Sequence, residues 1–201
     1  MIYTATQDAL KLPHDPFKAI VSPRPIGWIT ALSAKGEVNL SPYSFFNAIA
    51  TRPHIVAFSS EAKKDAVAFV EETREFTCSV VSKALIQQMN ATSAPLPRGQ
   101  SEYAHAGLEM APSRFVAPPR VAGTPAALEC KLLSVQQLVD LEGKAVDRWL
   151  VLGQVVGIFI DDAYLSDGRF DTLKANPVAR CGYMDYAEVD NLFSLQRPPG
   201  G

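Results

Sequence analysis

The chain has 201 residues, of which 47% are hydrophobic and 20% charged, and its formal net charge is −2. This length and composition predict one globular domain spanning 1–201 with a buried core. Because basic and acidic residues are mixed along the sequence, with no stripe of Lys and Arg, we expect neither nucleic acid nor a membrane surface as a partner.

The termini and the cysteines bear on the compartment. The opening stretch MIYTATQDALKLPHD lacks the basic start and apolar run of a secretion signal. The most apolar stretch, Trp149–Ile160, is too short to span a bilayer and contains Gln154. Cys78, Cys130 and Cys181 are far apart and form no CxxC pair, which is typical of buried thiols in a reducing compartment. We therefore expect a cytoplasmic protein.

The first part of the chain is rich in strand signals. Residues 1–21 form a lead-in in which prolines interrupt any helix. Three runs rich in Ile, Val and Phe then predict strands over Ile26–Leu32, Val38–Asn47 and His54–Ser60. After them, Lys63–Thr73 has apolar residues at helical spacing on one face and predicts a short amphipathic helix.

The second part continues with a strand over Glu75–Ser82 and a helix over Lys83–Asn90, with Ser82 as N-cap. The stretch Ala91–Pro119 is rich in Pro, Ser, Ala and Gly and has no sustained period. So long a loop is expected to serve as a lid, a binding loop or a subunit contact. Two long strands, Ala126–Val139 and Arg148–Ile160, flank the hairpin sequence DLEGK, and the tail from residue 164 mixes turns and short helices.

This order of elements favours a mainly β fold. About six strands stand against two or three helices, without βαβ alternation. We therefore expect an antiparallel sheet closed into a β-barrel, with flanking helices packed at its ends.

The absence of several motifs narrows the classes of site, although it does not exclude a triad hydrolase. There is no GxGxxG after a strand, no GxxxxGK[ST], no GxSxG and no HExxH. The three histidines have no spacing typical of metal ligands, so no metal site is predicted.

Polar residues on the early strands are the positive signal. Ser59 and Ser60, the start of the following helix and the lysines at 63 and 64 form a candidate phosphate site. Ser44 and Asn47 interrupt an otherwise aromatic segment. The alternatives are ordinary: a strand end with a capping Asn47, an N-cap before a solvated lysine face, a surface Arg24 and a core Trp28.

Several long blocks of the sequence occur in an order typical of one family. They are SPRPIGWIT, NLSPYSFFNAI, RPHIVAFSS, KKD, EFTCSVV, NATSAPLPRGQSEYAHAGL, APPRVAGTPAALECKL and VVGIFIDDAYLSDGRFDTLKANPVARCGYMDYAEVDNLFSLQRP. In these blocks the chain resembles the flavin reductase-like, FMN-binding split-barrel family, which includes flavoredoxins and the flavin-reductase components of monooxygenases. The resemblance covers nearly the whole chain.

The resemblance implies a six-stranded antiparallel barrel of Greek-key type that forms a homodimer and holds FMN near the subunit interface. It also implies a flavin reductase that transfers hydride from NADH or NADPH to flavin and supplies a partner monooxygenase. The alternative function is an FMN-binding electron carrier that another protein reduces. The third possibility is a barrel without a ligand, in which the polar residues on the strands belong to ordinary turns.

The resemblance also assigns site residues. Thr30, Ser44 and Asn47 would bind the ring and ribityl portions of FMN, and Trp28 would line the pocket. The phosphate would be held by Ser59, Ser60 and Lys64, with Arg24 as a further contact. The loop that covers the flavin or reaches the other subunit would contribute Asn90, Thr92, Ser93 and Glu102.

One position departs from the family pattern. Relatives often carry a histidine on the late long strand, where this chain has Phe159. If that histidine serves the reductant, its absence speaks against direct use of NAD(P)H. The alternative, which we favour, is that this position only packs.

Overall fold

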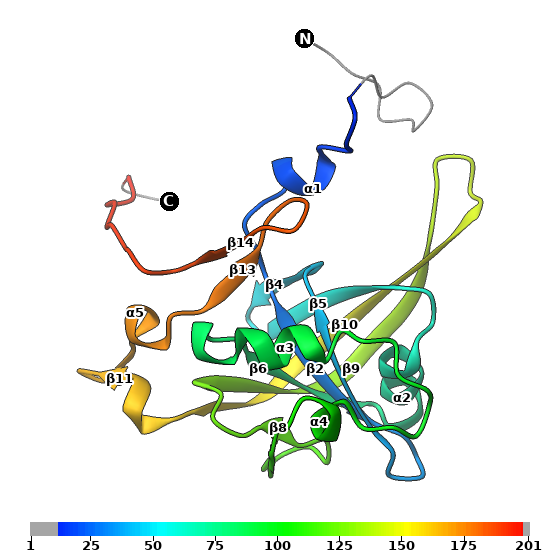
Figure 1. The fold of residues 1–201 in the computed structure, drawn as a ribbon, viewed down its shortest axis with the longest axis horizontal. Helices are drawn as coiled ribbons and strands as arrows, with labels where there is room; N and C mark the ends of the chain where they lie inside the picture. Colours follow the sequence, from blue (N-terminus) through cyan, green and yellow to red (C-terminus); the bar gives the residue numbers. More distant parts are fainter. Residues whose placement is uncertain (1–11, 199–201) are drawn as a thin grey trace.

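A seven-stranded antiparallel sheet forms the body of the protein (Figure 1). The structure is a computed structural model that describes residues 12–198, so expectations for 1–11 and 199–201 lie outside the described residues. The sheet has the strand order β3-β2-β6-β9-β10-β5-β4. The strands are β2 Gly27–Leu32, β3 Val38–Tyr43, β4 Phe46–Thr51, β5 His54–Glu61, β6 Glu75–Val80, β9 Ala126–Val139 and β10 Ala145–Ile160.

The two edges of this sheet come together at one corner of the chain. Strands β3 and β4 occupy opposite edges, yet only Ser44 and Phe45 separate them in the sequence. The sheet must therefore curl until its edges meet, which gives a barrel. The expected mainly β barrel is confirmed, but its count of six strands is corrected to seven. The predicted strand Val38–Asn47 turns at this corner and contributes to both edges.

The barrel core follows from the two-residue period of its strands. On β2 and β6 the buried side chains of Ile29 and Phe76 point inward, and Phe58 does so on β5. Helix α2 (Asp65–Thr73) packs Val67 and Val70 against the same core. The predicted amphipathic helix is thus confirmed, two residues shorter at its start.

A second apolar cluster lies on the opposite face of β2. Trp28 and Leu40 pack there against Met89 of α3 (Ile86–Ala91) and Tyr103 of α4 (Glu102–His105). Strand β2 is therefore buried on both faces. The predicted helix Lys83–Asn90 is a 3-10 turn, η2 (Lys83–Leu85), followed by α3, and the Ser82 side chain accepts no capping hydrogen bond.

The remaining elements are short and lie at the ends of the chain or in the long connections. They are α1 Phe17–Ile20, β1 Arg24–Pro25, β7 Met110–Ala111, β8 Arg120–Val121, η3 Asp162–Tyr164, β11 Leu165–Ser166, β12 Arg169–Phe170, α5 Thr172–Ala175, β13 Val178–Arg180 and β14 Tyr186–Glu188. Strands β1, β13 and β14 form a separate small sheet. Within residues 12–198, no helix combines the length and apolar character needed to cross a membrane.

Candidate functional site

Three hollows surround the corner where β3 turns into β4. The largest, of about 680 Å³, is here called the corner pocket, and a second, of about 450 Å³, the polar pocket. A bridging pocket of about 250 Å³ shares Ser44 with the corner pocket and shares Pro42 and Ser93 with the polar pocket. The three hollows therefore follow one another along the corner.

The corner pocket lies on the outer face of the barrel. Ala57 and Ser59 are two residues apart on β5 and share this face, with Asn47 of β4 paired to Ala57 and Leu150 of β10 paired to Ser59. Its lining is mostly apolar and includes the polar residues Ser44, Asn47 and Ser59. Such a hollow suits a flat aromatic ring that has polar atoms along one edge.

The polar pocket lies between β3 and the start of α2. Asn39, Ser41 and Tyr43 alternate along β3 and line one wall, and Lys64 lines another. Lys64 is the N-cap of α2 and provides no capping side chain for the N–H groups of the first turn. An ammonium group beside the positive end of a helix favours an anion such as a phosphate.

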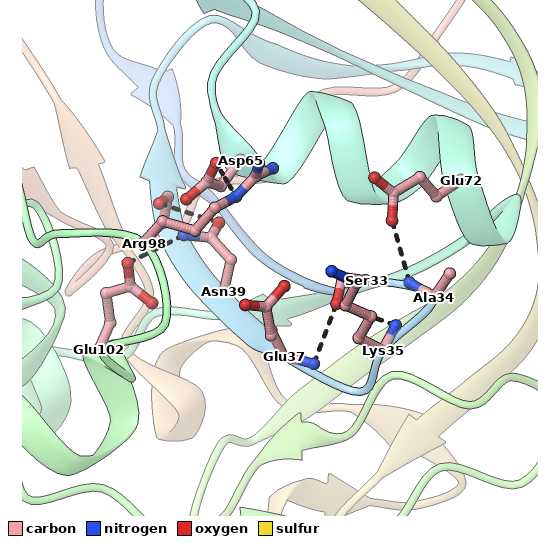
Figure 2. A network of polar contacts seen from close by, with 10 residues as sticks. Ser33, Ala34, Lys35, Glu37, Asn39, Asp65, Glu72, Arg98 and Glu102 are labelled. Atoms are coloured by element: carbon pink, nitrogen blue, oxygen red, sulfur yellow. Dashed lines mark hydrogen bonds and ion pairs between the residues drawn. The ribbon is translucent and has the colours of Figure 1, made fainter.

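A buried carboxylate closes the polar pocket on the third side (Figure 2). The Glu102 side chain accepts hydrogen bonds from Asn39 Nδ2 at 2.9 Å and from the Leu40 amide at 3.0 Å. Burial raises the pKa of Glu102, although the two hydrogen bonds oppose that shift. Nearby, Asp65 forms an ion pair with Arg98 at 3.2 Å.

Tyr43 connects the polar pocket with the barrel interior. Its ring packs against Phe58 with a centroid separation of 4.8 Å. Burial raises the pKa of Tyr43 to about 12, so its hydroxyl group stays protonated at neutral pH.

The predicted serine pair is divided between two faces of β5. Ser59 borders the corner pocket, whereas Ser60 is buried and donates to the carbonyl of Glu61 at 3.2 Å. Successive side chains on a strand point to opposite faces, so the two hydroxyls cannot hold one phosphate. The prediction of a joint serine cradle is therefore corrected.

The two predicted lysines also separate. Lys64 borders the polar pocket, and its contact with a phosphate stays a prediction. The Lys63 ammonium instead lies 2.5 Å from Glu71 of α2 and 4.9 Å from the centre of the Trp149 ring. Lys63 lines none of the three pockets.

Trp28 and Thr30 belong to the core and are corrected as direct ligand contacts. Both side chains are fully buried. The Trp28 indole donates to Thr92 Oγ1 at 2.9 Å, and the Thr30 hydroxyl bonds with that of Tyr103 at 2.7 Å. These side chains position the loop that follows α3, and for Trp28 the alternative reading as a core residue is the correct one.

Arg24 borders the corner pocket and is buried. Its guanidinium donates to the carbonyls of Lys18 and Val21 and, at 2.9 Å, to that of Cys181. Arg24 therefore ties the N-terminal segment to the turn after β13. Its Nε atom is buried and finds no hydrogen-bond partner among the described residues. An unsatisfied buried donor is costly, and an acceptor on a ligand in the corner pocket would relieve it.

The expected covering residues border the other two pockets. Asn90 and Ser93 line the bridging pocket, and Thr92, Ser93 and Glu102 line the polar pocket. Phe159 lines none of the three pockets. Its ring centre lies 3.7 Å from the Arg120 guanidinium, and that Phe159 only packs stays a prediction.

Several residues that line the polar pocket were not predicted from the sequence. Asn39, Tyr43 and Asp65 line the polar pocket but drew no attention as site residues. The available signal was the two-residue alternation of Asn39, Ser41 and Tyr43, which places them on one face of a strand.

Comparison with known proteins adds to this geometry. The family model described as "Flavin reductase like domain" matches residues 21–174. The chain belongs to this family. An uncharacterized protein of Halalkalibacterium halodurans is 34% identical over 183 residues, which make up 89% of this chain and 87% of that protein.

Two solved structures share the split-barrel fold over most of their length. Nitrilotriacetate monooxygenase component B from Bacillus cereus superposes with a TM-score of 0.86 at 25% identity, covering 97% of this chain and 99% of that one. The 2-nitrobenzoate 2-nitroreductase NbaA of Pseudomonas fluorescens gives a TM-score of 0.79 at 25% identity, covering 92% and 89%. These flavin reductase-like proteins agree with the barrel deduced from the strand order.

Proposed function

We propose that this protein is an NAD(P)H:flavin oxidoreductase that binds FMN around the β3–β4 corner. The observation that carries the proposal is the pairing of an apolar corner pocket with a lysine-bearing polar pocket through the bridging pocket, in a chain of this family. An amphipathic ligand with a flat ring at one end and an anion at the other matches that pairing.

The residues present fit such a ligand. Ser44, Asn47 and Ser59 line the corner pocket and offer hydrogen-bonding groups for the ring edge, and the unsatisfied Nε of Arg24 offers another. Lys64 and the first N–H groups of α2 would hold the phosphate in the polar pocket. Ser93 lines both the polar pocket and the bridging pocket, so its hydroxyl lies where a ribityl chain would pass.

When bound, FMN supplies the hydride chemistry itself. The task of the chain is to orient the ring, to exclude water and to hydrogen-bond the ring edge. This task requires no strong acid–base pair. Tyr43, at the wall of the polar pocket, is protonated and uncharged at neutral pH, which agrees with that expectation.

We further propose that a second copy of the chain covers the corner pocket. Ile20, Val21 and Ile49 line this pocket and are exposed. Apolar side chains around an open hollow are expected to be buried in an interface, and a homodimer would complete the ring site.

The deciding experiment is anaerobic oxidation of NADH and NADPH by the FMN-loaded protein, followed by bleaching of the flavin absorbance. We expect bleaching with at least one nucleotide. Flavin that binds but stays oxidised with both would contradict the reductase and favour an electron carrier reduced by another protein. A protein that binds no flavin would contradict both.

The electron acceptor is a separate question, because one solved relative is named as a monooxygenase component and the other as a nitroreductase. We propose that reduced flavin passes to a partner monooxygenase, by likeness to the component B protein. Turnover with nitrobenzoate in place of a partner would instead favour the activity named for the nitroreductase.

A further inference from the structure

Two arginines lie opposite each other on the small sheet of β1, β13 and β14. Arg24 of β1 pairs in register with Arg180 of β13, and Arg180 pairs in turn with Tyr186 of β14. Directly opposed residues of antiparallel strands project from the same face of a sheet. This face therefore borders the corner pocket at Arg24 and the bridging pocket at Arg180 and Tyr186.

No carboxylate neutralises the charge on this face within residues 12–198, where neither Arg24 nor Arg180 forms an ion pair. The Arg24 guanidinium donates only to backbone carbonyls, and its buried Nε has no partner among these residues. Arg180 donates to the carbonyls of Tyr183, at 2.5 Å, and Asp185, at 3.3 Å. Like charges directly opposite each other destabilise a strand pair, so an anion bound at this face would relieve the repulsion.

The Arg180 side chain is held in a fixed position for such a ligand. Its guanidinium lies 4.5 Å from the centre of the Tyr186 ring, and its two bonds to carbonyls orient it further. These bonds use only part of the five N–H donors of a guanidinium, so the others can meet a ligand in the bridging pocket. Among the described residues, Arg180 is the one basic side chain that lines this pocket.

We infer that Arg180 binds the diphosphate of the reducing nucleotide, NADH or NADPH. The inference rests on the proposed function, in which Lys64 holds the single phosphate of FMN and the flavin ring lies in the corner pocket. The reductant must place its nicotinamide against that ring, and one ribose separates the nicotinamide from the diphosphate.

The position of Arg180 suits this role. Adjacent strands are about 4.8 Å apart, so Arg180 is one strand away from Arg24 at the edge of the corner pocket. A planar guanidinium also binds phosphate oxygens in pairs, which an ammonium group does not. The two phosphate-bearing ligands would thus use different cations, Lys64 for the flavin and Arg180 for the nucleotide.

The test is Arg180→Gln, which removes the charge and keeps a polar side chain in the hairpin. ADP-ribose carries the diphosphate without the nicotinamide, and calorimetry measures its binding to the FMN-loaded protein. Quenching of flavin fluorescence measures FMN binding. We expect the dissociation constant of ADP-ribose to rise by about tenfold and that of FMN to change by less than about twofold. Arg180→Lys keeps the charge but not the paired donors and should lie between the two.

A matched control removes an arginine from another short strand. Arg169 of β12 is exposed, forms no ion pair among the described residues and lines none of the three pockets. Arg169→Gln should leave both dissociation constants unchanged.

Three results would overturn the inference and leave the proposed function intact, provided that the wild type still oxidises NADH or NADPH. They are no binding of ADP-ribose to the wild type, an unchanged ADP-ribose affinity in Arg180→Gln, and equal losses of ADP-ribose and FMN affinity in that variant. Equal losses would place Arg180 in the flavin site. A wild-type protein that binds FMN but oxidises neither nucleotide would overturn both the inference and the proposed function.

Discussion

Lys63 and Lys64 are adjacent in the chain but have different surroundings. Lys63 is held by Glu71, whereas Lys64 borders the polar pocket beside the uncapped start of α2. We therefore predict that Lys64→Ala weakens FMN binding by about ten- to hundredfold. A hydrogen bond to a charged group contributes roughly 1.5–3 kcal/mol. Titration of flavin fluorescence at low and high salt measures the loss and its electrostatic part.

The neighbouring lysine is the control for that prediction. Lys63→Ala removes the same charge one residue away and should change FMN affinity by less than about threefold, because screened surface charges contribute little. Equal losses in the two variants would mean that only net charge matters, and the assignment of the phosphate to the polar pocket would then be wrong.

Glu102 gives a prediction about pH. Burial raises the pKa of its carboxyl above the ordinary 4.5, so between that pH and the folded-state pKa the native protein binds more protons than the unfolded chain. This group's contribution to stability therefore decreases as pH rises through that window. Glu102→Gln cannot titrate, and the unfolding free energy of the variant minus that of the wild type should increase with pH above about 4.5.

Urea unfolding at several pH values from 4 to 7 measures this difference. The absolute stability of the variant is a poorer readout, because the amide presents an NH₂ group to one of the two donors, Asn39 Nδ2 and the Leu40 amide. A difference that is flat across this range would show that Glu102 ionises at the same pH in the folded and unfolded chains.

Two glycines of β10 let neighbouring rings approach the strand closely. A Cβ atom on Gly153 would lie 2.3 Å from Phe76 Cζ, and one on Gly157 would lie 2.4 Å from Phe115 Cδ2. Phe76 is fully buried in the barrel core, whereas Phe115 is 52% exposed and free to turn away. We predict that Gly153→Ala lowers the unfolding free energy by about 1–3 kcal/mol, the usual cost of overpacking a core.

Gly157→Ala is the comparison and should cost less than about 1 kcal/mol, since surface side chains adjust readily. Thermal or urea unfolding of both variants measures the contrast. An equal loss of unfolding free energy in both variants would mean that the added Cβ on β10 determines the effect. The rigidity of the facing ring would then not matter.

Elements with a regular pattern could be predicted from the sequence. The strand Ala126–Val139 matches β9, and α2 follows from apolar residues at helical spacing. The corner at Ser44 could not be predicted from the sequence, because residues on either side of it share one apolar and aromatic composition. Only pairing with β2 on one side and β5 on the other shows that two strands meet there.

The types of residue in the candidate site could be predicted from the sequence. Their distribution between the two faces of each strand could not. Ser59 and Ser60 were recognised together, and the alternation of β5 places them on opposite faces. Likewise, polar Thr30 resembled a ligand group, although its partner, Tyr103, comes from helix α4, 73 residues later in the chain. Such long-range partners cannot be deduced from local patterns.

At the scale of the molecule, the segments that project from the barrel surround the corner pocket. Helix α1 packs against the turn after β13 through Ala19 and Gly182, and Arg24 ties both segments together. Ile20 of α1 is 75% exposed and Ile49 of β4 is 59% exposed, and both line the corner pocket. A monomer would leave this apolar margin in water, which is the reason for expecting a dimer here.

We predict that Ile20→Asp/Ile49→Asp shifts the protein from dimer to monomer and weakens FMN binding in the same concentration range. Burying an unpaired carboxylate in an apolar contact costs several kcal/mol, so two of them should separate the subunits. Light scattering after gel filtration measures the mass, and flavin fluorescence measures binding. Leu141→Asp, at the fully exposed tip of the β9–β10 hairpin, is the control and should change neither. A variant that becomes monomeric yet binds FMN as before would show that one chain completes the ring site by itself.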